Sequence, residues 1–159
     1  MQTRVVTGRW AANLLYTTIL AVAALFSTPI LAVPQGGPIM PVTIPVSFST
    51  AYDNKAAALS QFACSNTFAN TPFKTLGDLK VFPDVGGASH FAGTDSPACG
   101  SCWKLTFNNT LSVNFLVVDA AGDGAILSQE AFSTLTGGQV GLGRVQATAQ
   151  QVDHTQCQF

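Results

Sequence analysis

The chain has 159 residues, 47% of them apolar, and its formal net charge at pH 7 is -1. This length and apolar content suffice for one buried core and leave no room for a second domain of ordinary size. Because only 9% of the residues are charged, the chain cannot assemble a surface that follows nucleic-acid phosphates or a polybasic membrane patch. The composition suits a neutral, hydroxyl-rich ligand.

Residues 1–32 have the pattern of a signal peptide. Arg4 and Arg9 precede an uncharged apolar run, and Pro29 follows it. Cleavage is expected after Ala32. The alternative is an uncleaved membrane anchor, because residues 10–33 are nearly long enough to span a bilayer. Removal of residues 1–32 leaves five Lys and Arg against eight Asp and Glu, so the mature chain would be mildly acidic.

The segment that follows has the composition of a flexible linker. Residues 33–43 contain three prolines, two glycines and no charge. The folded domain is therefore expected over residues 44–159. Within it, Gly86-Gly87 and Gly122-Asp123-Gly124 indicate tight turns or close approaches of two backbone segments.

A β-hairpin is predicted in the second half of the chain. Apolar and polar residues alternate over residues 103–107 and again over residues 111–117, with Asn108-Asn109-Thr110 between the two runs. The same triplet is an N-glycosylation sequon, with Asn108 as the acceptor at the exposed tip. Trp103 could stack on a sugar ring, but it shares the apolar face of its strand, so the pattern favours a core position.

A short helix and a further strand are predicted after the hairpin. Ser128 is a candidate N-cap for a helix of one or two turns, and Gly137-Gly138 would end it. Glu130 would lie near the positive end of this helix. Alternation over residues 145–149 then predicts a late strand. Short strands, turns and small helices indicate a β-rich barrel, whose type the residues alone do not fix.

The four cysteines follow the signal segment, so they are expected to form two disulfides in an oxidising compartment. From the residues alone all three pairings of Cys64, Cys99, Cys102 and Cys157 remain open. The spacing of Cys99 and Cys102 also allows a redox or zinc motif, but the chain has no second motif of this kind. Its two histidines lack ligand spacing, so no metal or cofactor is predicted.

Several motifs, in unbroken order over about residues 44–157, resemble the cerato-platanin family. They are ACSN at 63–66, TLGD at 75–78, FPDVGG at 82–87, DSPACGSCWK at 95–104, Val118-Asp119, Glu130-Ala131-Phe132, Gly143-Arg144-Val145, Val152-Asp153 and Cys157. The resemblance implies a six-stranded double-psi β-barrel related to the first domain of expansins. It also implies that Cys64 pairs with Cys99 and that Cys102 pairs with Cys157.

The resemblance further implies a secreted or wall-associated fungal protein that binds chitin oligomers, loosens cellulose without hydrolysis and elicits plant defence. Asp119 and Asp95 match acidic positions of the family, and the position of Asp119 matches that of the family's sugar-contacting aspartate. A carboxylate can accept two sugar hydroxyls. The alternative role of Asp119 is to stabilise a turn. Tyr52 could replace the tyrosine that many members carry a few residues earlier, with Asp53 beside it.

Two departures from the family pattern remove sugar-contacting groups. Thr94 stands where members commonly have tryptophan, and Gly124-Ala125-Ile126 replaces a segment that contains asparagine and phenylalanine. A shift in ligand choice or affinity is therefore expected.

Three functions are weighed. The first is non-catalytic binding of chitin-type or wall oligosaccharides, with a plant receptor as a possible further partner. The second is a surface-active, self-associating elicitor, for which exposed members of the group Phe62, Phe68, Phe73 and Phe82 would be responsible. The third, a weak glycosidase, requires two carboxyl groups about 5–9.5 Å apart. No such pair is evident, so the protein is not expected to be an enzyme.

Overall fold

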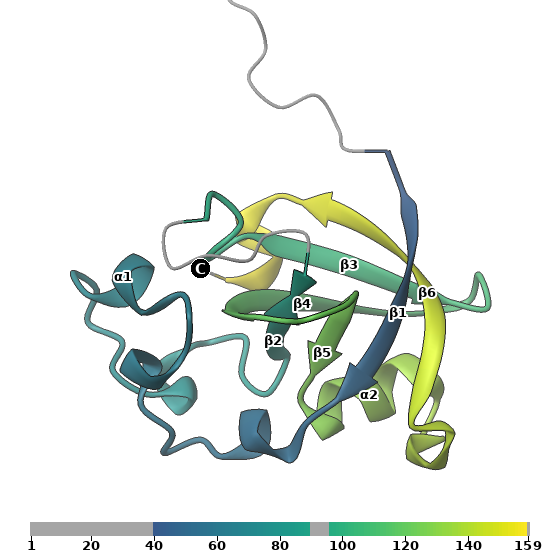
Figure 1. The fold of residues 1–159 in the computed structure, drawn as a ribbon, viewed down its shortest axis with the longest axis horizontal. Coiled ribbons are helices and arrows are strands. Elements are labelled where there is room, and N and C mark those ends of the chain that lie inside the picture. Colours follow the sequence, from purple (N-terminus) through teal and green to yellow (C-terminus); the bar gives the residue numbers. More distant parts are fainter. Residues whose placement is uncertain (1–39, 90–95, 159) are drawn as a thin grey trace, which may run out of the picture. The chain divides into compact units, whose positions relative to one another are not determined.

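The computed structural model describes residues 40–89 and 96–158. In this part of the chain, six strands close into a barrel in the order β1-β5-β2-β4-β3-β6 (Figure 1). The strands are β1 (Val42–Phe48), β2 (Val85–Ala88), β3 (Cys102–Phe107), β4 (Leu111–Ala120), β5 (Ala125–Leu127) and β6 (Arg144–Val152). The closed six-stranded barrel that the resemblance implied is confirmed.

The start of the described chain bears on the expected linker. β1 begins at Val42, inside the segment 33–43 whose composition is that of a linker. The predicted signal peptide, residues 1–32, lies outside the described residues. No helix within residues 40–89 and 96–158 is long and apolar enough to cross a membrane.

Two strand pairs are parallel, β1 with β5 and β2 with β4, and the other four are antiparallel. Parallel neighbours require crossing connections, and these bring backbones close together. A Cβ on Gly124 would lie 1.8 Å from the carbonyl oxygen of Pro45 in β1, and one on Gly86 would lie 2.3 Å from that of Ile126 in β5. Both predicted glycine clusters therefore contain a residue at which only glycine fits.

The predicted hairpin is formed by β3 and β4. Asn108 and Asn109 have φ angles of 49° and 58°, and the Thr110 amide donates to the carbonyl of Phe107 at 3.2 Å. Phe107 pairs with Leu111, so the loop has three residues, and its two central positive φ values form a tight turn that asparagine tolerates. β4 continues to Ala120, three residues beyond the predicted run.

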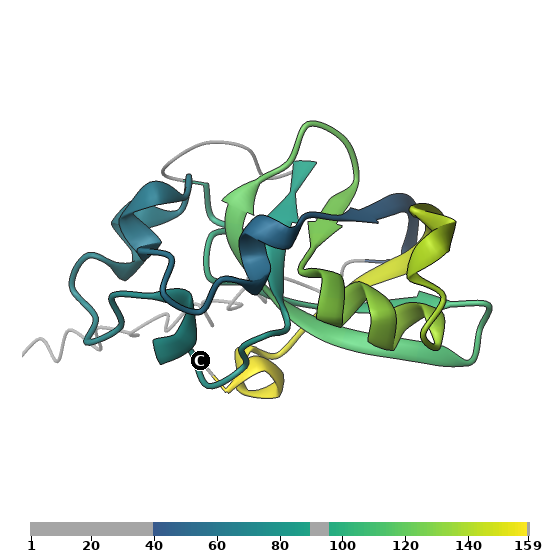
Figure 2. The same ribbon diagram turned by 90° about the horizontal axis from the view of Figure 1, so that it is seen from below.

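Helix α2 (Gln129–Thr136) confirms the predicted helix. The hydroxyl of Ser128 accepts a hydrogen bond from the Ala131 amide at 3.0 Å, and Gly137 ends the helix with a φ of 64°. Ala131, Phe132 and Leu135 are buried, and the helix packs against β4 (Figure 2). The N-terminal cap and the apolar face together hold α2 against the barrel.

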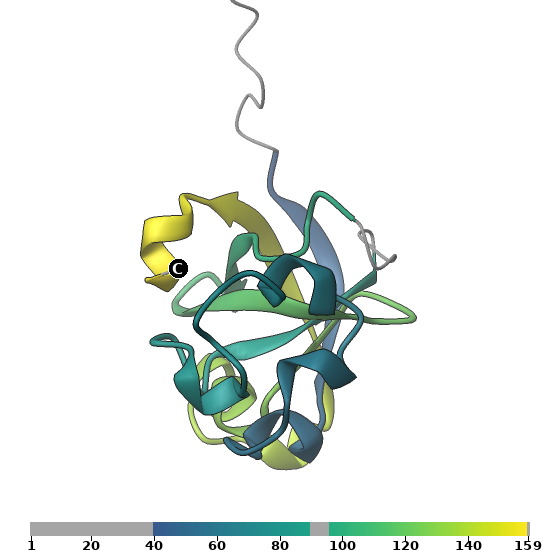
Figure 3. The same ribbon diagram turned by 90° about the vertical axis from the view of Figure 1, so that its left-hand side faces the viewer.

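The segment from Thr50 to Asp84 contains only short helices and lies to one side of the barrel (Figures 1 and 3). These are η1 (Thr50–Asp53), η2 (Leu59–Gln61), α1 (Ser65–Phe68) and η3 (Leu76–Asp78). Phe68 is buried, and three other aromatic residues are half-buried against the core, namely Phe62, Phe73 and Phe82. Trp103 is 4% exposed, which confirms its predicted core position.

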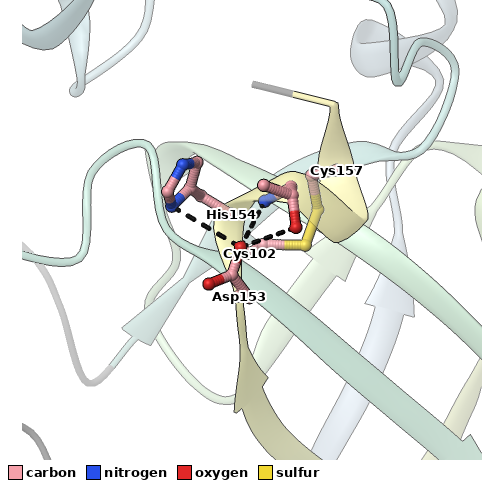
Figure 4. Close-up of polar contacts among 5 residues, drawn as sticks. Cys102, Asp153, His154 and Cys157 are labelled. Carbon is pink, nitrogen blue, oxygen red and sulfur yellow. Dashed lines mark hydrogen bonds and ion pairs between the residues drawn. A yellow bond between two sulfur atoms is a disulfide. The ribbon is translucent and has the colours of Figure 1, made fainter.

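The disulfides join Cys64 to Cys99 and Cys102 to Cys157, so the pairing that the resemblance implied is confirmed. Because Cys99 and Cys102 are bonded to different partners, they form neither a dithiol nor a zinc pair. Figure 4 shows the second disulfide tying the last helical turn, η6 (His154–Cys157), to β3. The Asp153 carboxylate caps this turn by accepting hydrogen bonds from the Thr155 amide at 2.9 Å and its hydroxyl at 2.6 Å.

Candidate functional site

One row of residues crosses four adjacent strands of the barrel. Asp119 of β4 is paired with Gly87 of β2, Gly87 with Ile126 of β5, and Ile126 with Ser47 of β1. Paired residues of neighbouring strands present their side chains on the same face of a sheet. We call these four residues the Asp119 row.

A β-bulge sets the direction of Asp119. Gly86 pairs with Val117, but the next residue, Gly87, pairs with Asp119, so Val118 is an extra residue in β4. In regular alternation Asp119 would share a face with Val117 and the buried core. The bulge instead places Asp119 on the face of Gly87, since successive residues of β2 point to opposite sides.

Both carboxylate oxygens of Asp119 are engaged by the protein. Oδ1 accepts hydrogen bonds from the amide of Ala63 at 2.8 Å and from that of Ala120 at 2.9 Å. Oδ2 accepts one from the Tyr52 hydroxyl at 2.9 Å. Asp119 thus joins the end of β4 to two segments that lie more than fifty residues away in the sequence. None of these three hydrogen bonds is that of an Asx turn over Ala120-Ala121-Gly122, the alternative role of Asp119.

These contacts limit what Asp119 can offer a ligand. A carboxylate has about four lone-pair positions, and the protein occupies three of them. One position on Oδ2 remains for a ligand hydroxyl. The donors of the protein therefore compete with a sugar for the acceptor positions of this carboxylate, and its contact with a sugar stays a prediction.

Tyr52 lies over Gly87 and donates to Asp119. Its hydroxyl oxygen is 3.1 Å from the position that a Cβ on Gly87 would take, so a side chain there would displace the tyrosine. Its ring is buried and stands 5.7 Å from that of Phe62. Burial, followed by the hydrogen bond to Asp119 and its charge, holds the pKa of Tyr52 well above the usual value near 10. Tyr52 is therefore a neutral donor at any physiological pH.

Asp53, which stands beside Tyr52 in the sequence, is not hydrogen-bonded to the pair formed by Tyr52 and Asp119. Asp53 instead caps α2, because its two oxygens accept hydrogen bonds from the amides of Gln129 at 3.0 Å and Glu130 at 3.2 Å. Asp95 and Thr94 lie outside the described residues. Ile126, which belongs to the segment that departs from the family pattern, places an apolar side chain in the Asp119 row. Sequence reasoning missed the capping role of Asp53, for which no local signal exists.

Asp84 is a second aspartate with an unusual environment. It is half-buried just before β2, and burial together with the nearby carboxylate of Glu130 raises its pKa from 3.8 to about 6. Between those two pH values the folded chain binds a proton that the unfolded chain has released. Stability is therefore expected to fall as pH rises from about 4 to about 6 and to remain constant above that, as far as Asp84 is concerned.

Replacing Asp84 with asparagine should remove this loss. The full pKa difference corresponds to about 3 kcal/mol, and solvent screening of a half-buried group reduces this to about 1–2 kcal/mol. Asp84→Asn is expected to stabilise the protein by that amount at pH 7 and not at pH 3.5. Urea unfolding at both pH values, with wild type as the reference, measures the difference. An equal effect at both would contradict the raised pKa.

Comparison with known proteins gives a consistent result. The family model described as Cerato-platanin matches residues 44–159. The chain is 35% identical to Allergen Asp f 15 of Aspergillus fumigatus over 150 residues, covering 89% of this chain and 96% of the relative. It is 37% identical to Cerato-platanin of Ceratocystis fimbriata f. sp. platani over 118 residues, covering 70% and 87%.

Solved structures agree with these matches. The crystal structure of cerato-platanin 2 from M. perniciosa has a TM-score of 0.69 at 33% identity, covering 74% of this chain and all of that one. The solution structure of "the fungal elicitor Cerato-Platanin" has a TM-score of 0.60 at 36% identity, covering 71% and 95%. The likeness therefore extends over the whole barrel.

Proposed function

The chain belongs to the cerato-platanin family, and from that premise we propose that it is a secreted, non-catalytic protein that binds chitin-type or cell-wall oligosaccharides at the Asp119 row. The observation that carries this proposal is the pair formed by Tyr52 and Asp119. One carboxylate lone pair and the hydroxyl oxygen of Tyr52 remain to accept hydrogen bonds from a sugar. A preorganised acceptor pair of this kind suits a ligand made of hydroxyl groups.

Several features support binding without cleavage. Glycoside hydrolysis requires a protonated carboxyl group opposite a second carboxylate. Both oxygens of Asp119 accept hydrogen bonds from donors of the protein. Asp53, whose carboxylate is committed to α2, cannot serve as its partner. Asp95 keeps the role of a second sugar-binding residue in the proposal.

The experiment is an NMR titration of the oxidised protein, as secreted by a eukaryotic host, with N-acetylglucosamine and glucose tetramers. Asp119→Asn is the main variant. Its Oδ1 can still accept from Ala63 and Ala120, and its amide group can donate to Tyr52, but the free acceptor on Oδ2 is lost. We expect affinity to fall at least tenfold, since a hydrogen bond to a charged group contributes about 1.5–3 kcal/mol. Stability should change by less than about 1.5 kcal/mol.

Asp119→Ala is the less informative variant. It would leave the Ala63 amide and the Tyr52 hydroxyl without an acceptor, which costs about 1–3 kcal/mol for each buried group. Loss of binding would then be mixed with loss of structure. Asp123→Asn is the matched control, because Asp123 is exposed on the adjacent loop and paired only with Arg144 among the residues described. Its affinity should equal that of wild type.

A second candidate function is a surface-active elicitor without a specific sugar site. It is favoured by a hollow of about 370 Å³ in the first half of the domain, whose lining includes the half-buried Phe73. One structural relative is described as a fungal elicitor. If no tetramer produces saturable shifts, the sugar-binding proposal fails and this candidate takes its place. Release of reducing sugar in proportion to protein would instead overturn the non-catalytic part.

A further inference from the structure

A second polar surface crosses strands β4, β3 and β6. Lys104 of β3 is paired on one side with Asn114 of β4 and on the other with Gln150 of β6. These three side chains therefore stand in a row, one strand spacing of about 4.8 Å apart. They line a hollow of about 410 Å³. Its lining, which we call the amide groove, consists of Lys104, Ser112, Asn114, Gln150, Val152 and Gln156.

The amide groove continues into an adjoining hollow. This second hollow, of about 400 Å³, shares Ser112, Asn114 and Gln156 with the first. Its lining also includes Lys80, Phe82 and Asp84 from the segment before β2, and Thr134 of α2. Two hollows with a common floor suit an extended chain of linked units better than one small molecule.

The walls of the groove are fixed by the fold. Four of its polar side chains, those of Lys104, Ser112, Asn114 and Gln150, project from paired strands, which hold a binding site more firmly than loops do. Gln156 lies on the η6 turn, which the Cys102–Cys157 disulfide ties to β3 and the Asp153 carboxylate caps (Figure 4). The groove is thus preorganised at its C-terminal end as well.

The chemistry of the groove indicates the class of ligand. Each amide side chain both donates and accepts hydrogen bonds, and Lys104 adds three donors. Neither Lys80 nor Lys104 forms an ion pair with a residue in the described ranges. None of the large apolar side chains that are exposed in the described ranges lines the amide groove, and those in the adjoining hollow, such as Val81 and Phe82, are half-buried. The groove therefore lacks the exposed anchors of a protein interface. Hydroxyl and acetamido groups match such a surface, because they too donate and accept.

We propose that the amide groove is a second binding site for a neutral oligosaccharide chain, separate from the Asp119 row. The ligand class rests on the proposed function, but the site does not include any residue of that row. The row spans β1, β5, β2 and β4, whereas the groove spans β4, β3 and β6, on nearly opposite walls of the closed barrel. Figures 2 and 3 show η6, which carries Gln156 of the groove, and the β4–β5 loop, which follows Asp119, on opposite sides of the barrel. One protein could therefore contact two polysaccharide chains.

The test uses the same NMR titration with N-acetylglucosamine and glucose tetramers, now followed at both surfaces. Asn114→Ala and Gln150→Ala should each weaken binding at the groove by about fivefold to tenfold, the effect of one lost hydrogen bond. Shifts around Asp119 should be unchanged. Gln146→Ala is the matched control, since Gln146 is an exposed glutamine of the same strand that does not line the groove. Its affinities at both surfaces should equal those of wild type.

The outcomes separate this inference from the proposed function. Saturable shifts at the groove that weaken in both groove variants, but not in Gln146→Ala, support the second site, whether or not the Asp119 row also responds. Shifts confined to the Asp119 row overturn the second site and leave the proposed function standing. If neither surface shows shifts, both the second site and the proposed function are overturned. Groove shifts that are unchanged by Asn114→Ala and Gln150→Ala also overturn the second site.

Discussion

Gly124→Ala is expected to destabilise the folded protein severely. The new Cβ would lie 1.8 Å from the carbonyl oxygen of Pro45 and 2.8 Å from its carbonyl carbon. Neither atom can move away easily, because Pro45 belongs to β1, which is paired with β5 on one side and β6 on the other. The φ angle of 62° adds about 1–2 kcal/mol for any residue with a side chain. We expect a total loss above about 4 kcal/mol, close to the whole stability of many domains.

Two other glycines separate the causes of this loss. Gly143 has a φ of 66° with a ψ of -46°, a strained conformation for a residue with a side chain, but open space around the position of its Cβ. Gly143→Ala should therefore cost only the conformational term of about 1–3 kcal/mol. Gly122 has open space and no positive φ, and its replacement should be nearly neutral. Guanidinium unfolding followed by circular dichroism measures all three. A loss in Gly124→Ala no larger than that in Gly143→Ala would show that the loop does not approach β1 as described.

Much of the fold could be predicted because its signals are local. The alternation on either side of Asn108-Asn109 reflects strands with one buried face, and the pair of asparagines reflects the two positive φ angles that the turn requires. Ser128 and Gly137 mark the ends of α2 for equally local reasons. Closure of the barrel and the pairing of the cysteines came from the family resemblance, since local patterns do not encode which distant strands meet.

The candidate site was less predictable because its geometry depends on distant residues. The bulge at Val118 decides which way Asp119 points, and nothing in the alternation before it signals an extra residue. The bonds from Tyr52 and Ala63 to Asp119 connect positions 67 and 56 residues apart. Asp53 is adjacent to Tyr52 in sequence, yet it caps α2, because a 3-10 turn directs neighbouring side chains in different directions.

Removing the Cys102–Cys157 disulfide is the second change with a large expected effect. In the chain-entropy model, a bond that closes a 55-residue loop contributes about 4 kcal/mol, and one that closes 35 residues, as between Cys64 and Cys99, contributes nearly the same. The double variants Cys102→Ala/Cys157→Ala and Cys64→Ala/Cys99→Ala should therefore lose similar stability in urea unfolding. A loss below about 1 kcal/mol in either would contradict this expectation.

The two double variants should differ in which surface they disturb. Loss of Cys102–Cys157 releases the η6 turn, and with it Gln156, so the amide groove should bind its ligand at least tenfold more weakly while the Asp119 row is unchanged. Loss of Cys64–Cys99 releases the segment in which the Ala63 amide donates to Asp119, so the Asp119 row should be affected and the groove spared. NMR titration of both variants at 10 °C, where each is expected to remain folded, makes the comparison. Equal weakening at both surfaces in both variants would mean that the disulfides stabilise the barrel as a whole and position neither surface.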